Sequence, residues 1–493
     1  MRRRPHRVPA GRRPPPGQHA HPTRSFRARW PVPGGCPRRR IHRLVGARRR
    51  SRAASPEHPR RRPAKTDPRH EHRDCPRGFP RRLCARAQGD LTPAARCQLT
   101  AKVDIRTPLP RQQAALEAAL LRGQAALDAW ERLRRTTNVL DETDAAVFRV
   151  LPLVYRNLRA EGLAEGDLGP LKGVYRQSWY RTRLALASVY GVLDVLESAG
   201  VEPIALKGLG LMATIYAEPA LRPMHDVDLL FRPGHYEAAV DAMLAARWRP
   251  LRGGREDFFR RIKVFHALPL VSGQGEGSQR LEVDMHRYML EENCFPGADA
   301  PVFARLVRGS VGEYPITTLS PEDHVVNACV HGVRWDPTPA LRWAPDAVTT
   351  IRAAGETFDW EYVVEEGRRR QTGLALAAAL RYAGRFEPSI PRDAVSRLAA
   401  GAGRLERWDF RAQQAREGVA PQVARYLTRY ARLSSHRSPW RKVADFPTYL
   451  ECMWELDRPR QVPVDGARRI IARARGRIPA RYLGRRNDGN RDS

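Results

Sequence analysis

Apolar residues recur with helical spacing through residues 171–199. Intervals of three, four and three residues place four of them on one face of a helix: Leu186, Val189, Leu193 and Leu196. Gly200 follows and is typical of the residue that ends a helix. Residues 112–135 are rich in Ala, Leu, Glu and Arg, which favour helices. Residues 141–160 open with Asp-Glu-Thr-Asp, acids suited to the positive end of a helix. The pattern thus predicts three helices before residue 200.

The apolar runs become shorter after Gly200 and are bounded by glycine, proline and polar clusters. They predict four strands, at residues 201–206, 226–231, 262–270 and 280–286. Helical patterns at 208–217 and 235–246 separate the first three strands, and the turn-rich residues 272–278 separate the last two. This order favours a small mixed sheet with helices packed on it, and hence an α+β fold.

Helical patterns return beyond residue 300. Ser320 and Pro321 are typical of an N-cap and a first helical position, and we expect this helix to run through His331. Further helices are expected at 340–354, 359–370 and 373–385, and from residue 388 towards a basic tail. We divide the chain into a leader (1–105), an N-terminal helical region (106–200), a sheet-containing core (201–320) and a C-terminal helical region (321–493).

Charge distinguishes the leader from the rest of this 493-residue chain. The net charge is +34, and residues 1–100 hold 28 of the 87 Lys and Arg but only 5 of the 53 Asp and Glu. Such a segment buries too little apolar surface to offset the entropy of ordering it, so we predict disorder. Three interpretations are open: an arm that binds nucleic acid, a targeting segment, or sequence upstream of a start codon chosen too early, with Val103 as a candidate start. No apolar stretch follows Met1, which excludes a secretory signal.

Composition indicates the cellular compartment in which the protein is expected. No run approaches the roughly 20 apolar residues needed to span a bilayer, so we expect no membrane association. Of the 7 cysteines, only Cys294, Cys329 and Cys452 lie beyond residue 100. That number is ordinary for a reducing compartment, and we expect a cytoplasmic protein.

Paired carboxylates are the first candidate chemistry. Asp226 and Asp228 are two residues apart in a predicted strand, so both side chains face the same side, while Val227 and Leu229 face the other. Two adjacent carboxylates repel each other unless a cation lies between them. Oxygen ligands at this spacing suit Mg²⁺ or Mn²⁺ held jointly with substrate phosphates.

Neighbouring residues strengthen this interpretation. Lys207-Gly208 lies at a strand end, where glycine lets backbone amides approach an anion, and Arg222 adds a second cation. Asp284 is a third carboxylate on a later strand, where it shares a face with His286. Three carboxylates on two neighbouring strands suit two metal ions about 4 Å apart. We expect His286 to form a hydrogen bond beside Asp284 rather than to bind metal.

Three segments resemble a known family: residues 203–208 (Pro-Ile-Ala-Leu-Lys-Gly), 221–230 (Leu-Arg-Pro-Met-His-Asp-Val-Asp-Leu-Leu) and 283–286 (Val-Asp-Met-His). They look like the bacterial uncharacterised nucleotidyltransferase family of the DNA polymerase β-like superfamily. His331, Arg342 and Asp346 match as well, and the resemblance spans roughly residues 110–400. It implies a nucleotidyltransferase core, metal binding at Asp226 and Asp228, and Asp284 as the third carboxylate. The superfamily's usual Gly-Ser is replaced here by Lys207-Gly208, with a longer gap before the acidic pair.

The expected reaction transfers a nucleoside monophosphate from an NTP to an unidentified acceptor with two divalent ions. Asp226, Asp228 and Asp284 would be catalytic and bind metal, and Lys207, Gly208 and Arg222 would bind the nucleotide. One alternative is a non-catalytic protein that binds nucleotide or nucleic acid, and another is a glycosyltransferase whose Asp-x-Asp binds a sugar nucleotide. Arg342 and Asp346, four residues apart, would either form an intrahelical ion pair or line the pocket.

Overall fold

The computed structural model describes most of the chain beyond the basic leader. Described are residues 105, 108–136, 145–272, 281–334, 341–415, 418–454 and 456. They belong to a unit that spans residues 101–493. The expectations for the leader, for the acidic residues 141–144, for most of the turn 272–278 and for the basic tail lie outside the described residues.

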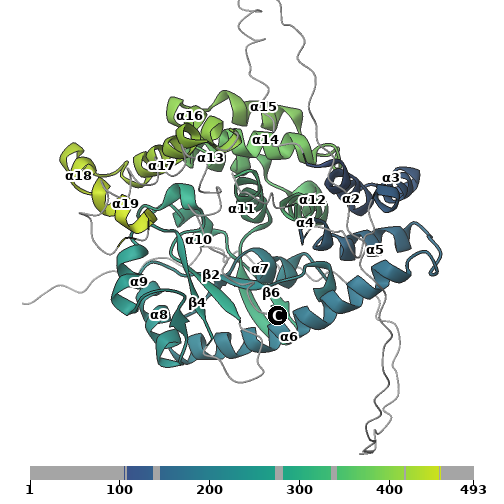
Figure 1. Cartoon of the computed structure of the whole chain (residues 1–493), viewed down its shortest axis with the longest axis horizontal. Coiled ribbons are helices and arrows are strands. Elements are labelled where there is room, and N and C mark those ends of the chain that lie inside the picture. Colours follow the sequence, from purple (N-terminus) through teal and green to yellow (C-terminus); the bar gives the residue numbers. More distant parts are fainter. Residues whose placement is uncertain are drawn as a thin grey trace, which may run out of the picture. The chain divides into compact units, whose positions relative to one another are not determined.

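A seven-stranded mixed sheet carries the residues of interest (Figure 1). In spatial order its strands are β3 (Arg249–Pro250), β4 (Ala267–Val271), β5 (Glu282–His286), β2 (Asp226–Leu230), β1 (Ile204–Ala205), β7 (Tyr314–Thr318) and β6 (Val307–Val311). β2 is parallel to β5 and β1 is parallel to β7, whereas the other neighbouring strands are antiparallel. The α+β class with a small mixed sheet is therefore confirmed.

The sheet differs from its prediction in four details, of which one is the two-residue edge strand β3, which no apolar run indicated. The predicted strand 262–270 is wrong in its first half, because the chain leaves helix α9 (Arg255–Arg261) there and β4 begins only at Ala267. Only two residues of the predicted strand 201–206 pair as β1. The hairpin of β6 and β7 was not predicted. Its first strand has partly buried and exposed positions instead of an apolar run, which explains why the sequence pattern did not indicate it.

The two faces of the sheet pack against different helices. Val227 and Val283 lie in one hydrophobic cluster with the apolar stripe of α6 (Gly169–Ser198) and with α8 (Tyr236–Ala245). Figure 1 shows α6 running along this side of the sheet. Leu230 points to the opposite face and packs in a second cluster with N-terminal and C-terminal helices. The acidic side chains of β2 and β5 alternate with the apolar ones, so they project away from α6.

Four helices precede α6: α2 (Pro110–Leu120), α3 (Gly123–Thr136), α4 (Ala145–Phe148) and α5 (Leu151–Ala160). The prediction of one helix over 112–135 is wrong, because the chain breaks between α2 and α3, where Gly123 adopts a φ of +57°. The long helix over 171–199 is confirmed as α6. Its stripe is buried except for the partly buried Leu193, and Gly200 follows it with a φ of +70°.

The remaining helices lie between the strands or follow the sheet in the chain. They are α7 (Lys207–Thr214), α10 (Ala300–Ala304), α11 (Pro321–Val333), α12 (Trp343–Ala354), α13 (Trp360–Arg369), α14 (Gly373–Ala383), α15 (Arg392–Ala400), α16 (Arg404–Gln414), α17 (Val419–Leu433), α18 (Pro439–Ala444) and α19 (Phe446–Trp454), with short 3-10 turns at Pro219–Leu221, Glu291–Asn293 and Gly355–Thr357. The Ser320 N-cap is confirmed, since its hydroxyl accepts a hydrogen bond from the Asp323 amide at 3.2 Å.

The N-terminal and C-terminal helices share one hydrophobic core. Polar contacts join them as well: the Tyr382 hydroxyl donates to Gln113 at 2.6 Å, and Arg352 donates to the Leu120 carbonyl at 3.0 Å. Within the described residues, no helix combines the length and the apolar composition that crossing a bilayer requires.

Candidate active site

Two neighbouring parallel strands, β2 and β5, carry the acidic residues of the candidate site. Their register pairs Asp226 with Glu282, Asp228 with Asp284, and Leu230 with His286. Because side chains alternate across a sheet, Asp228, Asp284 and His286 project from the same face. The buried apolar residues between them anchor both strands on the opposite face and so fix the position of the acids.

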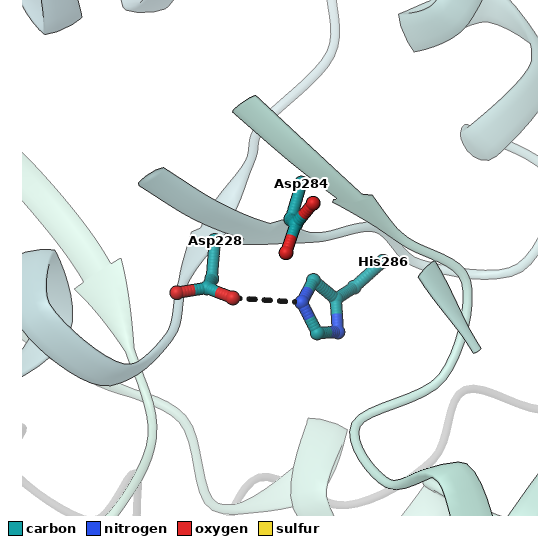
Figure 2. A group of neighbouring side chains, drawn as sticks. All are labelled: Asp228, Asp284 and His286. Atoms are coloured by element: carbon teal, nitrogen blue, oxygen red, sulfur yellow. Dashed lines mark hydrogen bonds and ion pairs between the residues drawn. The ribbon is translucent and has the colours of Figure 1, made fainter. Parts of the chain in front are cut away.

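Asp228, Asp284 and His286 form a buried cluster (Figure 2). One potential ligand atom from each side chain lies within 4.8 Å of the other two. None of the three residues is more than 4% exposed. Two carboxylates this close repel each other, and burial strengthens the repulsion because the local dielectric is low. The cluster therefore needs compensating positive charge.

His286 faces an acceptor on each side of its ring. Its Nδ1 lies 3.2 Å from the Tyr288 carbonyl oxygen, which can only accept, and its Nε2 lies 3.0 Å from Asp228 Oδ1. A neutral imidazole has a single N–H. With its proton on Nε2 the ring donates to Asp228; with its proton on Nδ1 it donates to Tyr288, and the Nε2 lone pair then faces the carboxylate, where a metal ion could bind both atoms.

Lys207 brings a cationic side chain to the cluster. It is the first residue of α7, and its Nζ lies 2.5 Å from Asp228 Oδ1. The Leu206 amide donates to the Asp228 carbonyl at 2.9 Å, which holds the start of α7 beside β2. Lys207 has a φ of +42°, in the left-handed region that residues other than glycine rarely adopt. Strained backbone of this kind is common where a side chain must be presented to a functional site.

The ionisation of Asp228 follows from these contacts. Burial raises its pKa, but the charge of Lys207 and the hydrogen bond from His286 outweigh burial, so the pKa of Asp228 lies well below its usual range. Asp228 is therefore a carboxylate at neutral pH. The repulsion between Asp228 and Asp284 is offset on the Asp228 side by Lys207.

Asp226 is half-buried and does not belong to the cluster of converging ligand atoms. Its charge acts on Arg342, whose NH1 group donates to the Pro223 carbonyl. Burial and the neighbouring Arg222 and Arg149 lower the pKa of Arg342 to about 9, which Asp226 only partly opposes. Within the described residues, neither Arg342 nor Arg149 forms an ion pair with a carboxylate.

The pKa of His225 is affected by the same positively charged region. Burial lowers its pKa, and Arg149, Arg342 and Arg181 lower it further. Three guanidinium groups thus act on a residue next to Asp226. Such a concentration of positive charge beside an acidic pair is suited to an anionic ligand.

Arg222 has a different environment. It is buried, and its Nε donates to both carboxylate oxygens of Asp346, at 2.9 and 3.1 Å. The Tyr216 hydroxyl donates to the same carboxylate at 2.9 Å. Asp346 thus pairs with Arg222 from the loop before β2, and not with Arg342 on its own helix as one sequence hypothesis had it. The nucleotide-binding role of Arg222 stays a prediction.

Two glycines at the start of α7 have different surroundings. A Cβ on Gly208 would lie 3.4 Å from Met224 Cγ and 3.7 Å from the Arg222 guanidinium, so a small side chain there meets no clash. A Cβ on Gly210 would lie 2.2 Å from Thr318 Oγ1 and 2.6 Å from the Ala205 carbonyl. Gly210 therefore lets α7 pack closely on β1 and β7, which holds Lys207 in place.

The fold and the site can now be compared with those of known protein families. Residues 144–387 match the family described as uncharacterised nucleotidyltransferase. The chain belongs to this family. The match covers the sheet and all the residues of the candidate site, and it confirms the resemblance found in the sequence. No curated protein and no solved structure matches the chain.

Nucleotidyltransferases typically use divalent metal ions, and the donor set of this member fits one. Two carboxylates and an imidazole converge from two adjacent strands, and His286 Nε2 lies 3.0 Å from Asp228 Oδ1, so the two atoms can bind the same ion. Carboxylates suit Mg²⁺ and Mn²⁺, whereas imidazole favours ions later in the first transition series. The mixed set is therefore better suited to Mn²⁺ than an all-carboxylate site would be.

Of the residues singled out in the sequence, the structure brings Asp228 and Asp284 together, and it adds His286 to them. His286 was expected to form a hydrogen bond, which it does, yet it also belongs to the potential ligand cluster. The signal was available, because His286 is two residues beyond Asp284 on the same strand face. Arg149, far away in the sequence, carried no such signal.

Proposed function

We propose that the protein transfers a nucleoside monophosphate from an NTP to an acceptor hydroxyl and releases pyrophosphate. One observation carries the proposal: in a chain of a nucleotidyltransferase family, Asp228 and Asp284 pair across two parallel strands and converge with His286 in a buried cluster. Neighbouring carboxylates in such a position serve to bind cations that also contact phosphates.

In this proposal Asp226, Asp228 and Asp284 bind two divalent ions, Mg²⁺ or Mn²⁺, with His286 as a further ligand to one of them. When bound, the ions neutralise phosphate charge and stabilise the leaving pyrophosphate. Asp284 also accepts the proton of the acceptor hydroxyl. Asp228 stays ionised throughout, because Lys207 keeps its pKa low.

The nucleotide phosphates would lie on the side of Lys207 and Gly208. The Lys207 amine has three donors and is 22% exposed, so it can contact a phosphate while it remains near Asp228. Arg342 and Arg149 add charge that no carboxylate within the described residues neutralises. We assign Arg222 to the same region, where its contact with Asp346 positions the loop that leads into β2.

The test is nucleotide transfer by the full chain. The protein would be incubated with each α-³²P-labelled NTP, Mg²⁺ or Mn²⁺, and cell extract, and both pyrophosphate release and labelled products would be measured. We expect release and transfer with the wild type, and neither with Asp284→Asn. The matched control is Asp241→Asn on α8, which removes a carboxylate from an exposed pair with Arg255 on α9 and should leave both unchanged.

Two outcomes would replace this proposal by its alternatives. Binding of NTP or nucleic acid without pyrophosphate release would support a non-catalytic binding protein. Transfer of sugar from a sugar nucleotide, with no use of NTP, would support a glycosyltransferase.

A further inference from the structure

A basic groove lies outside the candidate site, between the end of α9 and helices α17, α18 and α19. Its cavity has a volume of about 730 Å³. Cationic and aromatic side chains line it, among them Arg260, Lys263, Arg437, Arg441, Tyr430 and Tyr449. We call this cavity the basic groove.

The charge of the basic groove is only partly compensated. Arg260 is paired with Asp257 and Glu451, and Arg437 is paired with Asp445 at 2.7 Å. Lys263 and Arg441 are exposed, and neither has a carboxylate partner within the described residues. These two cations line the cavity, which favours an anionic occupant.

Aromatic and hydroxyl groups accompany these cations. Trp440 does not itself line the cavity, but it precedes the lining residue Arg441 on α18 and is 85% exposed, which is unusual for so large an apolar side chain. Ser438 and Thr448 bring hydroxyls to the lining. An exposed ring beside cations suits a single-stranded nucleic acid, because bases stack on the ring while the cations contact phosphates. Hydroxyls can contact the ribose 2′-OH, which distinguishes RNA from DNA.

The basic groove also lies close to the candidate site. Val264 belongs to its lining, and His266, two residues on, packs its ring against that of His286 with centroids 5.2 Å apart. Two residues span at most about 7 Å of chain. The lining of the basic groove and the ring beside Asp284 are therefore connected by a short stretch of chain.

We propose that the basic groove binds single-stranded RNA and that this RNA supplies the acceptor hydroxyl. The second part rests on the proposed function. In the reaction, the terminal ribose oxygen bonds to the α-phosphorus of the NTP, and the bond from that phosphorus to the oxygen bridging to the β-phosphate breaks. Pyrophosphate leaves with the electron pair, and the hydroxyl proton passes to Asp284. An anionic membrane fits less well, because the cations line a recess and not a flat surface.

The binding test uses the full chain, a labelled 12-nucleotide RNA without NTP, and a series of salt concentrations. The Lys263→Glu/Arg441→Glu double variant is compared with Arg156→Glu/Arg392→Glu, which makes the same change of net charge at exposed arginines on α5 and α15. This control cancels the contribution of the basic leader. The plot of the logarithm of the RNA association constant against the logarithm of salt concentration has a negative slope. If two phosphate contacts are lost, the magnitude of this slope should decrease by about 1.4 in the groove variant only.

Further binding measurements test which ligand the basic groove accepts. Trp440→Ala should weaken RNA binding at least about fivefold, and Trp440→Tyr should restore most of it. DNA of the same sequence should bind more weakly than RNA. Equal slopes for the groove and control variants, or binding of anionic vesicles in place of RNA that the groove variant abolishes, would overturn the proposal.

Transfer assays with the same RNA separate the two parts. Extension of the RNA by one nucleotide in the wild type, reduced in the groove variant, supports the whole proposal. Transfer of the label to some other acceptor overturns the acceptor assignment. Absence of transfer to any acceptor, with RNA binding in the groove intact, refutes the proposed function and the acceptor assignment but supports the groove as an RNA site.

Discussion

The ion pairs Arg222–Asp346 and Lys207–Asp228 differ in how fully the cation is committed to its carboxylate partner. Arg222 and Asp346 are both buried, a single guanidinium N–H contacts both carboxylate oxygens, and Tyr216 donates to the same carboxylate. Lys207 and Asp228 meet through one contact of 2.5 Å, and the lysine side chain is 22% exposed.

We interpret the Arg222–Asp346 pair as one that holds the loop in place, and we propose that Lys207 in the other pair also contacts the ligand. The guanidinium of Arg222 is planar and its position is fixed by two acceptor atoms, so it joins the loop to α12. The amine of Lys207 is a point charge with further donors free to turn. Both cations looked alike in the sequence as candidate phosphate ligands. Burial and the geometry of the partner, not residue type, decide between their roles.

The largest expected effect concerns stability. Arg222→Ala leaves the buried Asp346 carboxylate without its cation and should lower the free energy of unfolding by about 3–5 kcal/mol. Urea denaturation of the full chain measures this. The matched control Arg255→Ala breaks the exposed pair with Asp241 and should cost less than about 1 kcal/mol. Equal losses in the two variants would show that Arg222 does not act as a buried anchor.

The next largest effect is expected on the rate of nucleotide transfer. Asp284→Asn removes a charge from the ligand cluster and should lower the rate of nucleotide transfer about 10²- to 10³-fold, because metal-ion stabilisation contributes several kcal/mol. Circular dichroism should show an unchanged fold. A rate that falls only in step with the folded fraction would make Asp284 a structural carboxylate.

A smaller effect is expected for Lys207→Ala. Loss of one charge-assisted contact should weaken NTP binding by about 1.5–3 kcal/mol, measured by titration calorimetry with a non-hydrolysable analogue. Stability should fall less than in Arg222→Ala, because the lysine is partly exposed and His286 still contacts Asp228. Unchanged affinity would return Lys207 to the class of surface lysines and remove the contrast between the two pairs.

The smallest effect is a pH dependence at His324, which lies behind α7. Burial, with a further contribution from Arg222, lowers the pKa of His324 to about 3. The unfolded chain therefore binds a proton near pH 6.5 that the folded protein does not, so stability is full above that pH and declines as the pH falls towards 3.

The variant His324→Gln isolates this contribution, since its amide can still donate to Thr318. Between pH 6 and pH 5 the wild type should lose about 1 kcal/mol of unfolding free energy relative to the variant. A difference that stays constant over this range would show that His324 is not held neutral by burial.

The local sequence pattern was sufficient to predict a structural feature where that feature depends on a single helix or strand. The stripe of α6, the Ser320 N-cap and the alternation in β2 and β5 were all predictable, because each depends on residues a few positions apart. Prediction failed where tertiary packing overrides local preference. Residues 262–266 are apolar enough for a strand, yet Ile262 and Val264 reach hydrophobic clusters from a turn instead.

The sequence by itself determined which residues carry charge, which face of each strand they occupy and to which family the chain belongs. Only the tertiary structure decided their partners. Asp228 meets Asp284 because β2 and β5 pair in one register, and Arg222 meets Asp346 across 124 residues of chain. Such pairings depend on how distant segments share a core, and no local spacing encodes them. Long-range packing therefore decided that Lys207 would face the acidic cluster and that Arg222 would not.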